Sequence, residues 1–322
     1  MFRRLFAGVT VAIALAGCGG GGSGSGAGSG AASPVITARD TGRAWVAVAS
    51  SQDGSWLVAA VMGGQLYTSA DSGATWTARE SVRNWRAVAS SADGSKLVAA
   101  VNTGQIYTST NYGVSWAPVG VSMPWNAVAS SSDGSKLLGG VIGGQLYTSG
   151  DSGANWAGVV GTGAYWMSVA SSADGSMLVA ADHGNAVLAT GTGGFLYTSA
   201  DSGANWVSRD SLRYWTAVAS SSDGSKLAAA MWGGNIYTST DSGVTWTARE
   251  TARNWYAVAS SADGNRLVAA ESFGKLYASD NAGVTWTVLD NTIRNWQQIA
   301  SSADGSKLVA VVQGGYIYTI TR

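Results

Sequence analysis

Short apolar segments alternate with turns of glycine, aspartate and serine along most of the chain. In one representative stretch, Trp85–Ser91 and Lys96–Val101 are predicted strands, and an Asp-Gly pair of the kind that hairpins favour lies between them. A third strand, Gln105–Thr110, is rich in the isoleucine, tyrosine and threonine that suit strands. A fourth strand is expected after Trp116. The pattern predicts an all-β protein built from sets of four strands.

This set of four strands recurs, and a tryptophan opens each copy. The tryptophans are Trp45, Trp85, Trp125, Trp166, Trp215, Trp255 and Trp296, at steps of 40, 40, 41, 49, 40 and 41 residues. A period near 40 residues with several short strands is typical of a propeller blade. The sequence therefore predicts a seven-bladed β-propeller of four-stranded blades. We number the repeats 1 to 7 by these tryptophans and call their strands A to D.

The two ends of the repeated region complement each other. The chain stops at Arg322, after strand C of repeat 7, so that repeat lacks strand D. Residues 35–40 resemble the strand D that precedes Trp85, and both segments end five residues before their tryptophan. We therefore expect the propeller to span residues 35–322, with strand 35–40 completing the last blade and removing the open edges.

The first residues are typical of an export signal. A basic Met1–Arg4 precedes an apolar run of 13 residues, Leu5–Gly17, which is shorter than the roughly 20 residues that span a bilayer. The run ends in Leu-Ala-Gly-Cys, which resembles the lipobox of bacterial lipoproteins and implies lipidation of Cys18. A plain secretory signal with an incidental cysteine is the alternative.

These features predict an exported, lipid-anchored protein with a flexible tether. Residues 1–17 would be the signal peptide, and residues 18–34 the lipidated cysteine and a glycine- and serine-rich linker. The absence of aspartate after Cys18 fits the outer membrane of a Gram-negative cell, with the propeller periplasmic or surface-exposed. The lipid would be the protein's only attachment to the membrane.

Charge and composition narrow the possible partners. Charged residues are 12% of the chain, and 19 basic residues balance 19 acidic ones. No cluster of cations offers the counterion displacement that nucleic acid requires, so we expect no nucleic-acid partner. The chain has a single histidine and a single cysteine, and nothing in it resembles a metal site or a phosphate-binding loop. We expect no cofactor.

A second motif, Ser-x-Asp-x-Gly-x-x-Trp, precedes strand D in six places. Its aspartates are Asp71, Asp151, Asp201 and Asp241, and Asn111 and Asn281 replace aspartate in the other two copies. The motif resembles the Asp-box, or BNR repeat, of sialidase-like and photosystem-assembly propellers. The resemblance implies that these turns are structural, with the polar side chains bonded to the turn backbone and the tryptophan packed between strands.

The same resemblance raises the possibility of an enzyme. Sialidases need three arginines that converge on the substrate, a tyrosine paired with a glutamate, and an acid. The glutamates of this chain are Glu80, Glu250 and Glu271, and the first two stand in a repeated acid-x-x-Arg-x-Trp loop. We read that loop as a salt bridge or an arginine stacked on tryptophan, with a ring of arginines for an anion as the alternative. We therefore predict no catalysis and keep a sialidase-like glycoside hydrolase as an alternative.

The candidate binding site lies where the repeats differ most. The loops at 119–125 and 159–166 lose the acid and the arginine, and repeat 4 alone carries an insertion around the sole histidine. Trp56 and Trp232 break the repeat pattern and are candidate exposed aromatic side chains. The ligand-binding candidates are Met123, Trp125, Tyr165, Trp166, Asp182, His183, Asn185 and Trp232. For the strand-A tryptophans, packing between blades is the alternative to a ligand platform.

Two further positions vary among the repeats, the residue after the strand-A tryptophan and the residue before the B–C glycines. In propellers the D–A and B–C loops lie on one face, and a constant frame with varied tips suits a binding surface. We predict a monomeric, non-catalytic binding or scaffold propeller that recognises a protein or glycan of the cell envelope through this face. An envelope-complex assembly factor is a further alternative.

Overall fold

The computed structural model describes residues 33–159, 163–184 and 193–322, and these contain strands and no helix. Ser33–Arg322 form one compact unit. No helix capable of crossing a membrane occurs in the described part of the chain.

The strands follow the sequence repeats. They are β1 (Val35–Ser50), β2 (Leu57–Ser69), β3 (Thr77–Ser90), β4 (Leu97–Ser109), β5 (Ala117–Ser130), β6 (Leu137–Gly144), β7 (Leu146–Ser149), β8 (Ala157–Gly158), β9 (Ala164–Ser171), β10 (Leu178–Asp182), β11 (Gly194–Ser199), β12 (Val207–Arg213), β13 (Trp215–Ser220), β14 (Leu227–Met231), β15 (Gly234–Ser239), β16 (Thr247–Arg253), β17 (Trp255–Ser260), β18 (Leu267–Glu271), β19 (Gly274–Ser279), β20 (Thr287–Arg294), β21 (Trp296–Ser301) and β22 (Lys307–Thr321). All the pairings between them are antiparallel, as the hairpin turns between apolar segments predict.

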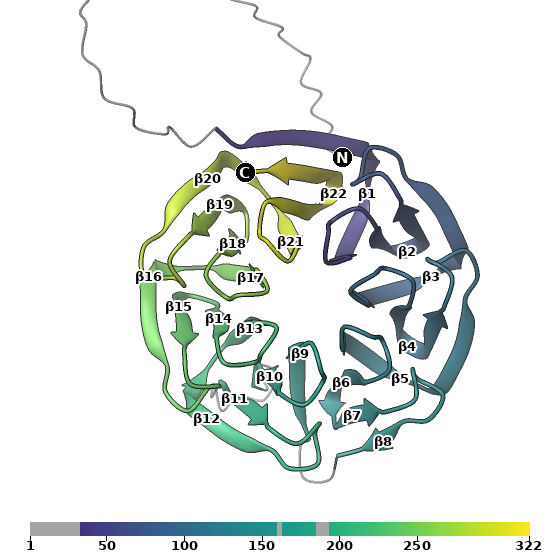
Figure 1. Ribbon diagram of the computed structural model, residues 1–322, viewed down its shortest axis with the longest axis horizontal. Coiled ribbons are helices and arrows are strands. Elements are labelled where there is room, and N and C mark those ends of the chain that lie inside the picture. The colour runs from purple at the N-terminus through teal and green to yellow at the C-terminus, as the bar shows by residue number, and fades with distance from the viewer. Residues whose placement is uncertain (1–32, 160–162, 185–192) are drawn as a thin grey trace, which may run out of the picture. The chain divides into compact units, whose positions relative to one another are not determined.

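Several strands serve two neighbouring repeats. The first half of β3 pairs with β2, where Arg79 stands opposite Leu66, and its second half pairs with β4, where Trp85 stands opposite Val101. Such shared strands join most of the chain into a path that runs from β12 through β1 to β21, while β13–β16 and β17–β20 form separate four-stranded sheets. The strands therefore do not form one closed sheet. Around the unit, the groups of strands follow one another about a central opening (Figure 1).

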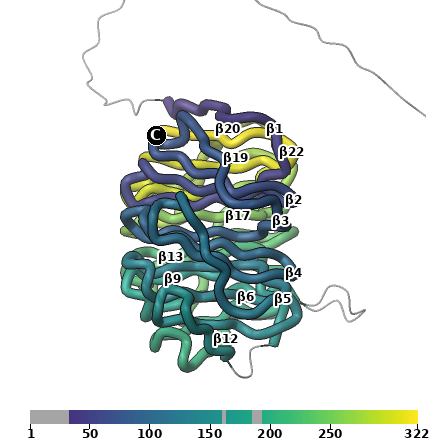
Figure 2. Tube along the Cα trace, turned by 90° about the vertical axis from the view of Figure 1, so that its right-hand side faces the viewer, coloured from purple at the N-terminus to yellow at the C-terminus, as the bar shows by residue number. Residues whose placement is uncertain are grey.

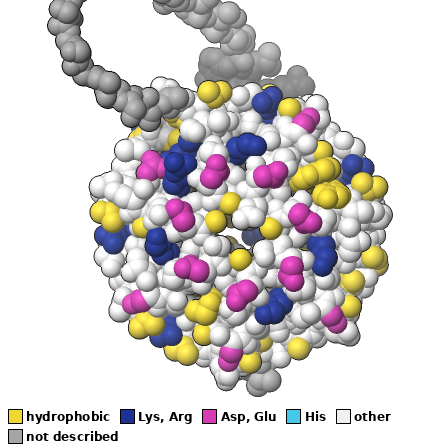
Figure 3. All heavy atoms as spheres, in the orientation of Figure 1, with side chains coloured by type: hydrophobic (Ala, Val, Ile, Leu, Met, Phe, Trp, Pro, Cys, Tyr) yellow, Lys and Arg dark blue, Asp and Glu magenta, His cyan; other side chains and the backbone are white. Residues whose placement is uncertain are grey.

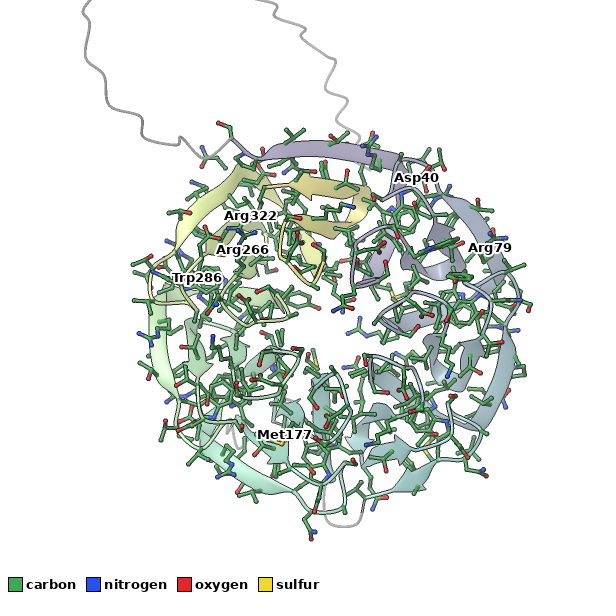
Figure 4. All side chains as sticks on the ribbon, viewed as in Figure 1. Asp40, Arg79, Met177, Arg266, Trp286 and Arg322 are labelled. Carbon is green, nitrogen blue, oxygen red and sulfur yellow. The ribbon has the colours of Figure 1, made fainter. Side chains whose placement is uncertain are left out.

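The first and last strands of the unit lie side by side (Figures 1 and 2). β1 pairs with β22 from Val35 opposite Thr321 to Ala44 opposite Gln313, and then continues into its pairing with β2. Arg322 follows directly, and its Nη2 lies 2.6 Å from Asp280 Oδ1. Arg266, beside Arg322 in Figure 4, approaches the same carboxylate at 3.7 Å. Residues from opposite ends of the unit thus share one sheet.

The A–B turns of all seven repeats are joined by a cycle of backbone hydrogen bonds. The N–H of Gln52 donates to the carbonyl of Ala92, and the same bond recurs at each step until the N–H of Ala303 donates to the carbonyl of Gln52. The seven bonds connect residues 52, 92, 132, 173, 222, 262 and 303, and each is 2.7 Å long. The repeats therefore follow one another in a ring.

Acidic and basic side chains alternate around the opening on the face shown in Figure 3.

The same turns also interlock through side chains. Lys136 Nζ donates to Ser202 Oγ of the next repeat at 3.2 Å, and Lys307 approaches Ser72 in the same way. Trp56 replaces the lysine in repeat 1, and its ring lies 4.2 Å from that of Tyr112, which replaces the serine. The A–B turns of repeats 1, 3 and 7 thus contact the repeat that follows each of them.

The core consists of clusters formed between neighbouring repeats. The strand-A tryptophans are at most 1% exposed, and each lies edge-on to a strand-C tyrosine at centroid distances of 5.1–5.4 Å. Trp255, for example, packs among Ala217 and Ala230 of the preceding repeat. This arrangement agrees with the packing alternative for the strand-A tryptophans.

The Ser-x-Asp-x-Gly-x-x-Trp turns hold themselves together. Ser69 Oγ accepts a hydrogen bond from the N–H of Gly73 at 2.9 Å and donates to Asp71 Oδ1 at 2.7 Å. Asp71 in turn accepts from the N–H of Thr75, and the indole of Trp76 donates to the Gly73 carbonyl. Asn111 accepts from the N–H of Ser115 at the same distance, 2.9 Å, as Asp71 does from Thr75, so an amide can replace the carboxylate.

Replacing Ser69 by alanine should destabilise the protein by about 1–3 kcal/mol, because the buried N–H of Gly73 loses its acceptor. Urea unfolding followed by circular dichroism measures the effect. Ser208, on an exposed stretch of β12, is the control, and its alanine variant should stay within about 0.5 kcal/mol of the parent. Equal stability of the two variants would contradict the role assigned to the Ser69 hydroxyl.

The A–B turns predict a loss of stability in acid. The hydroxyl of Ser51, then the N–H and the hydroxyl of Ser55, lower the pKa of Asp53 from 3.8 to about 2. Similar hydrogen bonds lower the pKa values of Asp174, Asp223 and Asp304 to about 2. At pH values between about 2 and 3.8, these carboxylates bind more protons in the unfolded chain than in the folded one, so protonation favours unfolding.

The stability that these carboxylates contribute should therefore be complete above about pH 5 and fall from there to about pH 2. Thermal melts across this range measure the fall, and substitution of several of these aspartates by asparagine should reduce it. A melting temperature that does not change down to about pH 2 would show that these carboxylates contribute no pH-dependent stability.

Candidate functional site

A cavity of about 330 Å³ lies at the centre of the ring. Strand A of every repeat lines it, and the lining side chains are mostly alanine, valine and serine. One end is bounded by the A–B turns, where the serine hydroxyls that end strand A donate to the next carbonyl, as from Ser50 to Ser51 at 2.8 Å. The other end lies where strand A begins, beside the B–C turns, because Trp45 pairs with Val61 and Trp255 with Glu271.

This second end carries a tier of different side chains. The residues that follow the strand-A tryptophans all line the cavity, and they are Val46, Arg86, Asn126, Met167, Thr216, Tyr256 and Gln297. The next positions along strand A are nearly constant, with Ala, Val, Ala and Ser in most repeats. The frame of the cavity is thus uniform, whereas this tier is not. We call these residues the entrance tier.

Hydrogen bonds fix several members of the entrance tier. Asn126 Nδ2 donates to the carbonyl of Trp166 at 2.8 Å, and Asn126 Oδ1 accepts from Arg86 Nε at 2.7 Å. Thr216 Oγ1 donates to the carbonyl of Trp255 at 2.9 Å. These side chains therefore satisfy carbonyls at the inner edges of neighbouring strands and stay in place around the entrance.

Aromatic side chains from repeats 4, 5 and 6 gather beside the entrance tier. The Trp232 ring lies 6.4 Å from that of Tyr256, and the His183 ring lies 5.4 Å from that of Tyr214. His183 Nδ1 is 3.0 Å from the carbonyl of Trp215. Trp232 is 40% exposed, and Phe273, on the next B–C turn, is 70% exposed. This part of the face could contact an apolar or aromatic group.

Two of the predicted site residues are buried in the core, and a third, Met123, is partly buried against it. Trp125 and Trp166 are 1% and 0% exposed, which leaves no ring face open for a ligand. Met123 stands where other repeats have the loop arginine, and it packs with Trp125 and Tyr147 in one apolar cluster. It therefore replaces the arginine as cover for the strand-C tyrosine.

The other predicted residues divide between turn and surface. Asp182 Oδ1 accepts from the N–H of Tyr165 at 3.0 Å and from that of Gly184 at 2.9 Å, so its carboxylate organises the turn. His183 and Trp232 reach the aromatic group beside the entrance tier. Asn185 lies outside the described residues.

The repeated acid and arginine form a stack in the structure. Arg83 Nη2 lies 3.4 Å from Glu80 Oε1, and the guanidinium carbon lies 4.6 Å from the centre of the Tyr107 ring. The same pairing occurs at Asp40–Arg43, Asp210–Arg213, Glu250–Arg253 and Asp290–Arg294. The ion pairs agree with the structural interpretation of the loop. The arginines lie closer to the strand-C tyrosine, at 4.2–4.8 Å, than to the tryptophan on which stacking was predicted, at 5.2–5.9 Å. In the described part of the chain, no group of three or more His, Cys, Asp or Glu side chains could hold a metal ion.

Sequence reasoning did not single out Arg86 or Tyr256 as site residues. Both follow a strand-A tryptophan, and the variation of that position predicted a binding surface without distinguishing these two residues from the other five. What the sequence lacks is the knowledge that all seven copies of this position surround one cavity.

Comparison with known proteins identifies related folds. No protein-family model and no characterised protein matches the sequence. YCF48 from Cyanidioschyzon merolae superposes with a TM-score of 0.69 at 15% identity, covering 90% of this chain and 99% of that one. A structure of YCF48 bound to D1 peptide gives 0.69 at 17% identity, covering 91% and 98%.

A xyloglucanase from Xanthomonas campestris gives a TM-score of 0.68 at 20% identity, covering 89% of this chain and 53% of that one. The chain therefore spans about half the length of that enzyme. These likenesses show a β-propeller fold.

Proposed function

We propose that residues 35–322 form a seven-bladed β-propeller whose N-terminal strand, residues 35–40, completes the last blade. The cycle of hydrogen bonds through all seven A–B turns and the pairing of β1 with β22 support this architecture. The Ser-x-Asp-x-Gly-x-x-Trp turns then correspond to Asp-boxes at the blade edges. The likeness to YCF48, which covers 90% of this chain and 99% of that one, agrees with a fold of similar size.

On this propeller, a non-catalytic site binds a segment of another protein at the end of the cavity that carries the entrance tier. One observation carries the proposal: seven different side chains stand on an otherwise uniform frame, around a cavity of about 330 Å³. The exposed Trp232 and Phe273 beside it add apolar surface. The presence of a peptide on the similar YCF48 fold supports a protein ligand over a glycan. Assembly of a cell-envelope complex is a role that such binding would serve.

A photo-crosslinking residue in place of Phe273 tests this function. Phe273 lies on a B–C turn, whereas Val284, 57% exposed, lies in the turn between β19 and β20 of the same repeat, on the opposite face, and is the matched control position. We expect covalent adducts with a protein from the Phe273 position and none from the Val284 position. Equal adducts from both positions, or binding to glycan arrays without any protein adduct, would contradict the proposal.

A glycoside hydrolase is the second candidate, and the similarity to the xyloglucanase fold favours it. Against it, Glu80 and Glu250 are ion-paired in the repeated stack, and the Glu271 side chain lies over Gly274. Release of reducing sugar from xyloglucan, or of fluorophore from a sialoside, would establish this alternative.

The lipobox-like leader supports export and attachment through lipid on Cys18, and the linker to residue 34 would tether the propeller. Cells fed a labelled fatty acid should label the parent chain and not its Cys18→Ser variant. Labelling of both chains would contradict lipidation at Cys18.

A further inference from the structure

Of the described residues that line the central cavity, Arg86 is the one lysine or arginine, and none is acidic. The arginines of the repeated loop stack have acidic partners, and Arg266 and Arg322 share Asp280. Arg79, Arg209 and Arg249 each donate from Nε to a strand-C threonine hydroxyl. Among the described residues, Arg86 has no ion-pair partner, although it lines a cavity of mostly uncharged side chains, chiefly alanine, valine and serine.

The guanidinium of Arg86 is held in one orientation. Because Asn126 donates to the carbonyl of Trp166, its Oδ1 turns toward Arg86 and accepts the Nε–H at 2.7 Å. Asn126 is only 5% exposed, so this support is packed in place. The two terminal amino groups of Arg86 make no hydrogen bond to the described residues. Their N–H groups therefore form a free pair of parallel donors, an end-on fork. Such a fork matches the two oxygens of a carboxylate.

The surroundings favour an anion of modest size. The cavity volume of about 330 Å³ is near the lower end of the range for small-molecule sites, roughly 300–1,000 Å³. It therefore suits a side chain or a chain end better than a folded element. Attraction between Arg86 and an anion is stronger here than on an open surface, because the protein walls replace part of the water around the pair. Tyr256 and Gln297, elsewhere in the entrance tier, offer an aromatic ring and an amide to the rest of the ligand.

We propose that Arg86, oriented by Asn126, forms an anion site at the cavity entrance that receives a carboxylate of the bound protein segment. The carboxylate is either an acidic side chain or a C-terminus, because both present the same two oxygens. This proposal rests on the proposed protein-binding function and adds the chemistry that the site selects.

The Nε–H signal of Arg86 in ¹⁵N-labelled protein reports on the site directly. We expect titration with acetate to shift this signal saturably and titration with acetamide to leave it unchanged. Three acetylated tripeptides then separate the sources of the carboxylate: trialanine with a free C-terminus, trialanine amide, and an amide with a central aspartate. The free C-terminus or the aspartate peptide should bind, and trialanine amide should not.

Substitutions at Arg86 provide the second measurement. Arg86→Gln should weaken binding of the preferred peptide at least tenfold, and Arg86→Lys should weaken it less because the charge remains without the fork. Arg79→Gln is the matched control, since Arg79 lies on an outer strand away from the central opening, and its binding should equal that of the parent (Figure 4). Circular dichroism melts confirm that each variant is folded.

Two results would overturn the anion site: equal shifts with acetate and acetamide, or unchanged peptide binding by a folded Arg86→Gln variant. The fate of the broader function is separable. If Arg86→Gln still gives the protein adduct from Phe273, the anion site fails while protein binding stands. If acetate binds at Arg86 but no protein adduct forms, the anion site stands and the proposed function fails.

Discussion

A chain that begins at Arg43 will be less stable than the parent by on the order of 3–5 kcal/mol, and it will self-associate. The deletion removes Val35–Arg39, which pair with Ile317–Thr321 of β22, and with them the partly buried Ile36 and the Arg39–Thr319 hydrogen bond. The deleted residues no longer have to lose conformational entropy on folding, but the free energy lost with their burial and hydrogen bonds is larger. The exposed edge of β22 is then free to pair with another molecule.

Thermal unfolding and light scattering measure these two effects. The melting temperature should fall by roughly 10 °C, and the apparent mass should rise with protein concentration. A chain that begins at Ser33 keeps all of β1 and is the matched control, so its stability should equal that of the full chain. An excess of a synthetic peptide of residues 33–44 should restore the truncated protein. A monomer of parental stability would show that β1 does not stabilise the unit.

Replacing Trp255 by alanine should lower the free energy of unfolding by about 3–5 kcal/mol. The indole is fully buried between repeats 5 and 6, lies edge-on to Tyr277 at 5.1 Å, and donates to the carbonyl of Thr251. Alanine would leave a cavity in a rigid sheet that cannot collapse around it. For a domain of this size the melting temperature should fall by roughly 6–20 °C.

Trp232→Ala is the control for this substitution, since Trp232 is the same residue type but 40% exposed on a B–C turn. Its stability should stay within about 0.5–1 kcal/mol of the parent. Urea unfolding followed by far-ultraviolet circular dichroism compares the two variants without relying on tryptophan fluorescence. Similar losses from both substitutions would contradict the assignment of Trp255 to the core.

The strands and turns follow from the sequence because each is encoded locally and many times. The apolar alternation, the Asp-Gly pairs and the tryptophans place strand A in every repeat, and the turn at Ser69–Trp76 forms within a few residues. The pairing of the segment at 35–40 with strand C of repeat 7 was also predictable, since the missing strand and its substitute have the same spacing to tryptophan.

The candidate site was harder to predict, because it depends on contacts between repeats. Whether a side chain such as Arg86 has an acidic partner depends on the strands of all the other repeats that line the cavity. The sequence around Arg86 does not show which residues these strands place near it. Because contacts between repeats are not visible in the local sequence, Trp125 and Trp166 were predicted as ligand-binding residues, although the structure buries them. Deviation from a repeat marks function only when the deviating residue also reaches an open surface.

The stacked pair of Trp56 and Tyr112 has a consequence for how this repeated sequence can diverge. The two residues belong to consecutive repeats and replace a lysine and a serine that contact each other elsewhere in the ring. Either replacement alone would set an aromatic ring against a partner of the wrong size. The contacting residues of neighbouring repeats are therefore expected to change together. A single repeat could be exchanged between such proteins only together with the residues that it contacts in the next repeat.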